Sequence, residues 1–190
     1  MKRRVTALLL ALWMAGAHAA AFEPLPPPVA AQGSVQAAFA PWNDVEKLVV
    51  DELNGAKKQI LIQAYLLTSK KIAGALVAAN RRGIDVQVLM DATQMEKIPA
   101  SKALLLTDAG VPVWLETAYQ NAHNKVIIID ANTATPVLLT GSYNYTWAAA
   151  HQNAENLLVL RNEPALAAQY LHNWKRHQKD ASRYRPAQPR

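Results

Sequence analysis

The sequence predicts an α/β sandwich, in which a mixed and largely buried β-sheet is flanked by helices. Two observations lead to this fold class, and composition agrees with it. Short apolar segments of strand length alternate with segments whose apolar residues recur at helical spacing. Some strand segments are almost continuously apolar, such as QILIQAYLLT at 59–68, as expected for strands covered on both faces. With 51% hydrophobic and 18% charged residues, the composition is that of a globular protein.

The expected elements follow one another along most of the chain. Strands are predicted at 35–42, 59–68, 84–91, 111–116, 123–130, 136–142 and 155–161. Helices are predicted at 43–56, 70–82, 99–109 and 164–178. Asn43 or Asp44 is expected to cap the first helix, and Ser69 the second. Gly83 and Gly110 are expected to end the second and third helices.

The N-terminal residues have the pattern of a secretory signal peptide, here assigned to 1–19. A basic segment at 2–4 precedes an apolar segment at 5–15 and an A-x-A cleavage site at 17–19. A Pro-rich linker is expected at 20–34 and a single domain at 35–178. The protein is therefore expected to be exported, to the periplasm or beyond. It contains no cysteine, which excludes disulfides and thiolate chemistry.

The positive charge is concentrated near the C-terminus. The chain carries a formal net charge of +6, and six of its Lys and Arg residues lie in the last sixteen positions. A basic tail is therefore predicted at 179–190. Such a tail can hold nucleic acid or an anionic membrane surface, or it can be a solvated chain end. Both interpretations remain open from the sequence.

One stretch carries residues suited to phosphate chemistry. His123 and Lys125 lie two residues apart in an expected strand, so their side chains project to the same side. A lysine beside a nucleophile offsets the negative charge of a phosphate that would otherwise repel the attack. Asp130 follows seven residues after His123, and spacing places it on the opposite face. We therefore expect a structural ion pair or turn role for Asp130.

The pattern H-x-K-x4-D at His123, Lys125 and Asp130 resembles the signature of the phospholipase D superfamily. Two further elements of that signature are present downstream, namely Gly141, Ser142 and Asn144, followed by Asn153, Glu155 and Asn156. The spacing from Asp130 to Gly141 is longer than is common in the family, and the additional residues at 131–136 predict a longer hairpin loop. The leader and the single motif are most similar to the small secreted bacterial endonucleases of that superfamily.

The resemblance implies a role for each matched residue. His123 attacks phosphorus to give a phosphohistidine, and a second histidine protonates the leaving alcohol. Because the chain supplies one motif histidine, a symmetric homodimer is the simplest way to complete the site. Lys125, Ser142 and Asn144 bind the phosphate oxygens. Glu155 accepts the Nδ1 proton of a histidine.

Three functions remain open at this stage. The preferred function is a sequence-nonspecific endonuclease acting on DNA, RNA or both, with no metal and no cofactor. The second is a phospholipase D acting on phosphatidyl headgroups, with anionic lipid as an alternative substrate. The third is a non-catalytic protein that binds nucleic acid or the cell envelope. Tyr143, Tyr145 and Trp147 either stack on bases or pack in the core.

Overall fold

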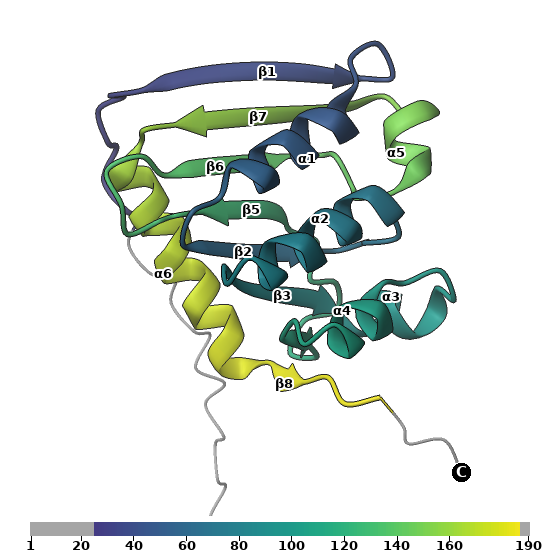
Figure 1. Cartoon of the computed structure of the whole chain (residues 1–190). Coiled ribbons are helices and arrows are strands. Elements are labelled where there is room, and N and C mark those ends of the chain that lie inside the picture. The colour runs from purple at the N-terminus through teal and green to yellow at the C-terminus, as the bar shows by residue number, and fades with distance from the viewer. Residues whose placement is uncertain (1–24, 187–190) are drawn as a thin grey trace, which may run out of the picture.

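The computed structural model describes residues 25–186, and its centre is a mixed eight-stranded sheet (Figure 1). The strands are Ser34–Ala40 (β1), Gln59–Ala64 (β2), Asp85–Asp91 (β3), Val113–Glu116 (β4), Lys125–Ile129 (β5), Val137–Gly141 (β6), Glu155–Arg161 (β7) and Ser182–Arg183 (β8). Their order in the sheet is β1-β7-β6-β5-β2-β3-β4-β8. The strand β3 is parallel to β2 and β4, whereas the remaining pairs are antiparallel.

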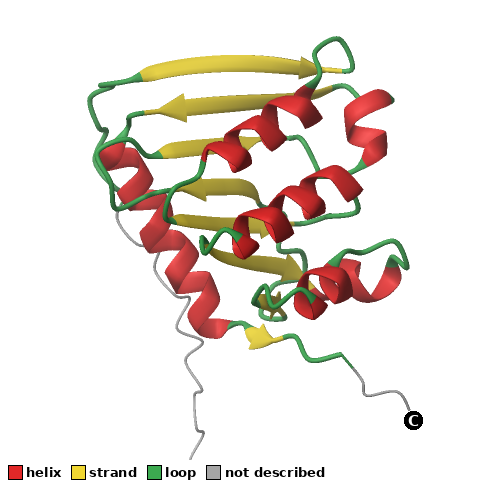
Figure 2. Ribbon diagram, viewed as in Figure 1, coloured by secondary structure: helices red, strands yellow, loops and turns green. Residues whose placement is uncertain are grey.

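Helices cover both faces of this sheet (Figure 2). They are Val45–Gly55 (α1), Lys70–Arg81 (α2), Ala92–Lys97 (α3), Ala103–Asp108 (α4), Trp147–His151 (α5) and Pro164–Asp180 (α6). Alternate residues of β5 belong to two separate apolar clusters: Ile127 packs with α1 and α2, whereas Ile128 packs with Leu171 and Trp174 of α6. The predicted α/β sandwich with a buried mixed sheet is confirmed.

The two predicted helix caps are present. The Asp44 carboxylate accepts the backbone N–H of Lys47 at 2.9 Å and begins α1. The Ser69 hydroxyl accepts the backbone N–H of Ile72 at 3.1 Å and begins α2. Each cap satisfies a donor that the first helical turn would leave unpaired.

Three short elements were not predicted, namely α3, α5 and β8. Helices of five or six residues have little stability of their own, so tertiary contacts rather than local sequence decide whether they form.

Two predicted elements are several residues shorter than expected. The third helix begins at Ala103, after Pro99. The strand predicted at 59–68 ends at Ala64, because the next residues bond to a neighbouring loop: Thr68 N–H donates to the Tyr145 carbonyl at 3.0 Å.

The hairpin between β5 and β6 contains the long loop that the sequence indicated. Its strands pair antiparallel from Val126 opposite Thr140 to Ile129 opposite Val137. The expected signal peptide and the first part of the linker lie outside the described residues. Among the helices of the described part, none is long and apolar enough to cross a membrane.

Candidate active site

The matched polar residues meet at one edge of the sheet. This edge contains the end of β2, the start of β5, the end of β6 and the start of β7, and it lies on the right in Figure 1. The antiparallel pairing of β5 with β2 and β6 brings segments that are distant in sequence to this edge. His123, Lys125, Ser142, Asn144 and Glu155 all come from it.

Two anchored residues hold His123 in place. Before it, the backbone N–H of Ala122 donates to the carboxylate of Asp91 at 2.8 Å, and Asp91 is 2% exposed. After it, the carbonyl of Asn124 accepts the backbone N–H of Tyr65 at 3.0 Å. The His123 side chain itself is exposed. The chain on both sides of His123 is therefore fixed to the ends of β2 and β3.

Lys125 contacts His123 directly. Its Nζ atom lies 2.9 Å from Nδ1 and 3.1 Å from Nε2 of the imidazole, and it donates to the His123 carbonyl at 2.8 Å. Since an ammonium group can only donate, a ring nitrogen that bonds to it must present a lone pair. The Lys125 ammonium therefore lies directly against the imidazole of His123, within hydrogen-bonding distance of both ring nitrogens.

Tyr65 lies against both members of this pair, and no motif in the sequence pointed to it. Its ring centroid lies 4.3 Å from that of His123 and 4.7 Å from Nζ of Lys125. Lys125 is 5% exposed and forms no salt bridge with a described residue. Burial lowers the pKa of the Lys125 ammonium, and the charge of Glu155 opposes that shift. The ring face of Tyr65 stabilises this buried cation.

The second signature element joins β6 to β7 at close range. A Cβ added to Gly141 would lie 2.3 Å from the carbonyl oxygen of Asn156, so a side chain at this position would clash with backbone. The same carbonyl accepts the backbone N–H groups of Ser142 and Tyr143 at 3.1 and 3.2 Å. Glycine is thus required for the approach of the two strands.

Glu155 is held by two polar side chains. The Ser142 hydroxyl donates to Oε2 at 2.6 Å, and the Asn153 amide donates to Oε1 at 3.1 Å. Ser142 also accepts the backbone N–H of Asn156 at 3.0 Å. The hydroxyl proton of Ser142 is therefore directed to Glu155 and not toward His123 and Lys125. No hydrogen bond joins Glu155 to His123 in this arrangement of the described residues.

The side chain of Asn144 has an unpaired oxygen. Its Oδ1 atom is buried and has no hydrogen-bond partner among the described residues. A carbonyl oxygen only accepts hydrogen bonds, so a phosphate oxygen would have to bind the Nδ2 amino group of Asn144. The flanking Tyr143 and Tyr145 are fully buried and pack edge to face, with ring centroids 6.3 Å apart. Those two rings belong to the core and anchor the chain on both sides of Asn144 in the sequence, whereas Trp147 is 59% exposed.

Asp130 lies at the other end of β5, away from this edge. Its carboxylate accepts the backbone N–H groups of Lys57, Lys58 and Gln59 at 2.9, 2.7 and 2.9 Å. Its own backbone is left-handed, with φ of 53°. Asp130 thus fastens the chain that enters β2 to the hairpin that leaves β5.

Other polar features of the described part do not contribute to this edge. His177 pairs with the buried Glu116 at 2.6 Å; burial raises the pKa of Glu116, His177 opposes that shift, and Asp91 adds to it. The described residues contain no cluster of three His, Asp or Glu side chains that could hold a metal ion.

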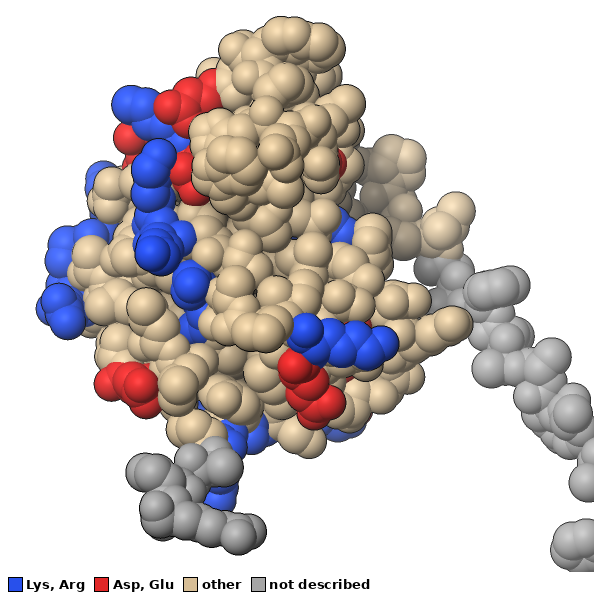
Figure 3. Space-filling model, turned by 90° about the vertical axis from the view of Figure 1, so that its right-hand side faces the viewer, with Lys and Arg blue, Asp and Glu red and all other residues tan. Residues whose placement is uncertain are grey.

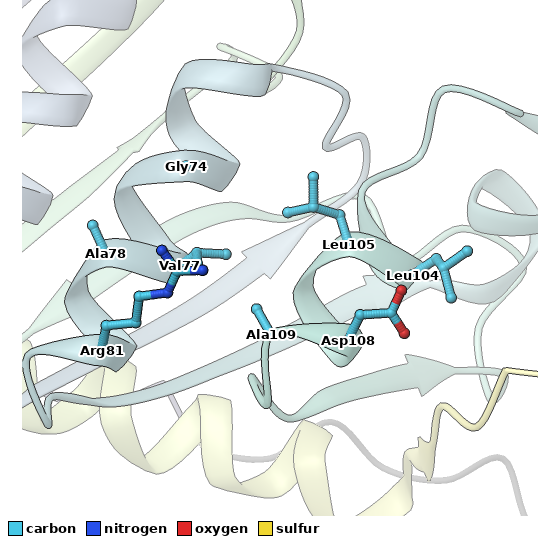
Figure 4. Close-up of a pocket in the computed structure, with 8 residues that line it drawn as sticks. All are labelled: Gly74, Val77, Ala78, Arg81, Leu104, Leu105, Asp108 and Ala109. Carbon is cyan, nitrogen blue, oxygen red and sulfur yellow. The ribbon is translucent and has the colours of Figure 1, made fainter.

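A cavity of about 720 Å³ between α2 and α4 contains none of the signature residues (Figure 4). It is lined by Gly74, Val77, Ala78, Arg81, Leu104, Leu105, Asp108 and Ala109.

Comparisons with known proteins agree with this geometry. Residues 49–177 match the family model described as "Cardiolipin synthase, PLD-like domain". A protein named phospholipase D from Rickettsia typhi is 36% identical over 147 residues, which are 77% of this chain and 69% of that relative. The chain belongs to the phospholipase D superfamily.

Two solved structures show the same fold. Nuc from Salmonella typhimurium, a phospholipase D family member, is 34% identical with a TM-score of 0.75. The match covers 82% of this chain and 100% of Nuc. NucT from Helicobacter pylori has a TM-score of 0.71 at 20% identity, covering 80% of this chain and 100% of NucT, and so shares the fold. The protein is thus a phosphodiesterase of the phospholipase D superfamily.

Proposed function

We propose that this protein is an exported, sequence-nonspecific endonuclease that needs no metal and works as a homodimer. The observation that carries the proposal is the contact between His123 and the buried Lys125. It places a ring nitrogen of His123 beside a fixed positive charge, at the edge that also carries Asn144. This arrangement suits attack on the phosphorus of a diester.

The proposed reaction has two steps. A ring nitrogen of His123 forms a bond to phosphorus, the bond from phosphorus to the leaving oxygen breaks, and that oxygen takes a proton from His123 of the partner subunit. Water then attacks phosphorus, giving a proton to the same histidine of the partner subunit, and the phosphohistidine bond breaks. Lys125 and Asn144 stabilise the charge on the non-bridging oxygens in both steps. Glu155, fixed by Ser142 and Asn153, supports the imidazolium that forms.

The dimer follows from the chemistry, because each chain has one signature histidine and the reaction uses two. Exposed apolar side chains close to the same edge favour an interface there. Phe39 and Trp42, at the end of β1, are 50% and 82% exposed, and β1 contacts α5. Phe39 lies opposite Asn156 in the sheet, so this apolar rim begins beside the second signature element. A second copy that covers the rim brings the two His123 side chains toward one site.

Charge favours nucleic acid as the substrate. Figure 3 views the edge that contains the site, and its left part carries Lys and Arg side chains with a smaller number of Asp and Glu side chains among them. Basic side chains around a phosphodiesterase site attract a polyanion along its length.

The second candidate is a phospholipase D, and two observations favour it. The Rickettsia typhi relative carries that name. The rim of Phe39 and Trp42 is also the kind of surface that enters a lipid interface. The same rim therefore has two uses, and substrate tests decide between them.

A substrate panel tests the proposal. The purified mature protein is incubated in excess EDTA with plasmid DNA, RNA and phosphatidylcholine vesicles. We expect both nucleic acids to be cut in the presence of EDTA, because the positive charge of Lys125 does the work that a metal would do. We expect no choline to be released, because the proposed substrate is nucleic acid. Choline release with intact nucleic acids would establish the phospholipase, and no hydrolysis of any substrate would favour a binding protein. The His123→Asn variant, prepared in parallel, controls for contaminating nucleases.

A further inference from the structure

A groove of about 380 Å³ opens between the start of α2 and the short helix α5. Thr68, Ser69, Lys70 and Lys71 line one side, and Trp147 and His151 line the other. The groove adjoins the site through the backbone. The Tyr145 carbonyl accepts the N–H groups of Thr68 and Ser69, both at 3.0 Å, and Tyr145 is the residue after Asn144. Trp147 follows Asn144 by three residues, a reach of at most about 10 Å.

Trp147 presents a fixed aromatic surface to this groove. Trp147 is 59% exposed and lies at the start of the helix α5. The Thr146 hydroxyl accepts the backbone N–H of Ala149 at 3.1 Å and so caps α5 at its first turn. The ring of His151, one turn later, lies 5.0 Å from that of Trp147 and supports it from one side. An exposed indole on a capped helix is suited to stacking on a planar group.

The groove also contains an available positive charge. Glu46, at its base, is engaged by Lys71 at 2.9 Å and by the Ser69 hydroxyl at 2.6 Å. These hydrogen bonds outweigh burial and lower the pKa of Glu46, so the carboxylate stays ionised and neutralises Lys71. Lys70 is exposed and has no ion-pair partner among the described residues. It is therefore the cation that can bind a further anionic group.

We propose that this groove binds the nucleotide next to the scissile phosphate of a single-stranded polynucleotide. The base stacks on Trp147, and the phosphate on the far side of that nucleotide pairs with Lys70. This inference rests on the proposed nuclease function and extends it, since it assigns a place to a second nucleotide. An aromatic platform beside a backbone-binding cation is the usual arrangement for single strands, and stacking tolerates any base.

The test compares a long substrate with a short one. For each variant, kcat/KM is measured on a single-stranded oligonucleotide and on methyl p-nitrophenyl phosphate, which carries neither a base nor a second phosphate. We expect the ratio of the two values to fall roughly tenfold in Trp147→Ala and to recover largely in Trp147→Phe. In the His123→Asn background, Lys70→Ala should reduce the salt slope of oligonucleotide binding by about 0.7, the value for one phosphate contact on a single strand.

Matched controls lie outside the groove. Lys57 is an exposed lysine before β2, at the opposite end of that strand, and Leu104 is an exposed apolar residue of α4. Alanine at either position should leave both readouts unchanged.

The outcomes separate this inference from the proposed function. If the wild-type protein cleaves the oligonucleotide but Trp147→Ala and Lys70→Ala leave both readouts unchanged, the groove assignment is wrong and the nuclease stands. If the wild-type protein cleaves no nucleic acid, both proposals fail. If the two variants lose association with anionic vesicles but not with the oligonucleotide, the groove contacts a membrane, and the assignment to a nucleotide is overturned.

Discussion

Replacing His123 by asparagine should lower turnover by about four orders of magnitude or more, because the reaction loses the atom that bonds to phosphorus. Folding should be unaffected. The His123 side chain is exposed, and its hydrogen-bonding partner in the described structure is Lys125. Asparagine keeps an oxygen that can accept from that ammonium. The free energy of unfolding should therefore change by less than about 0.5 kcal/mol.

Three measurements check this expectation. Hydrolysis of a soluble diester gives the turnover, thermal unfolding gives the stability, and intact-protein mass after an alkaline quench detects a covalent adduct. The adduct should appear in the wild-type protein and be absent in His123→Asn. Retention of most activity in the variant would remove His123 from the mechanism. Equal loss of structure and activity would mean that the residue acts through folding.

Replacing Asp130 by alanine should have the opposite effect, with a loss of stability of roughly 2–4 kcal/mol. The variant leaves the backbone N–H groups of Lys57, Lys58 and Gln59 without their acceptor. It also places alanine at a φ of 53°, where a Cβ without a polar group is strained. Asp130→Asn should cost less, because asparagine tolerates this conformation and keeps one acceptor oxygen.

Urea unfolding measures these costs, and turnover per folded molecule should stay close to that of the wild type. Asp85 provides a matched control. It is an exposed aspartate at the start of β3, and its hydrogen bonds go to the side chains of Gln59 and Gln87. Asp85→Ala should therefore cost little. Unchanged stability together with lost activity in Asp130→Ala would place Asp130 in the chemistry instead.

The fold was predictable from the sequence where local patterns decide it. Continuous apolar runs predicted the central strands, and Asp44 and Ser69 predicted the caps of α1 and α2, because both signals depend on neighbouring residues alone. The helix α5 was missed because it has five residues and is fixed by its contacts. The strand β8 has two residues, and its pairing with β4 depends on a segment far away in sequence.

The site was predictable in its residues but not in its contacts. The spacing of His123 and Lys125 on one strand implied that they meet, and Nζ does lie within 3.1 Å of the ring. Three other contacts join segments that no local pattern connects. Tyr65, just after β2, contacts His123; Asp91, at the end of β3, holds Ala122; and Ser142, just after β6, donates to Glu155 of β7. Such pairs are set by sheet order, which a single sequence does not specify.

The shared site is the central claim, and subunit mixing tests it most directly. Wild-type and His123→Asn chains are mixed in equal amounts, allowed to exchange subunits, and assayed on a soluble diester. If each reaction uses His123 from both subunits, only dimers of two wild-type chains are active. The mixture should then show about a quarter of the activity of the same total amount of wild-type protein. Retention of about half the activity would mean that each chain works alone, and it would contradict the shared site.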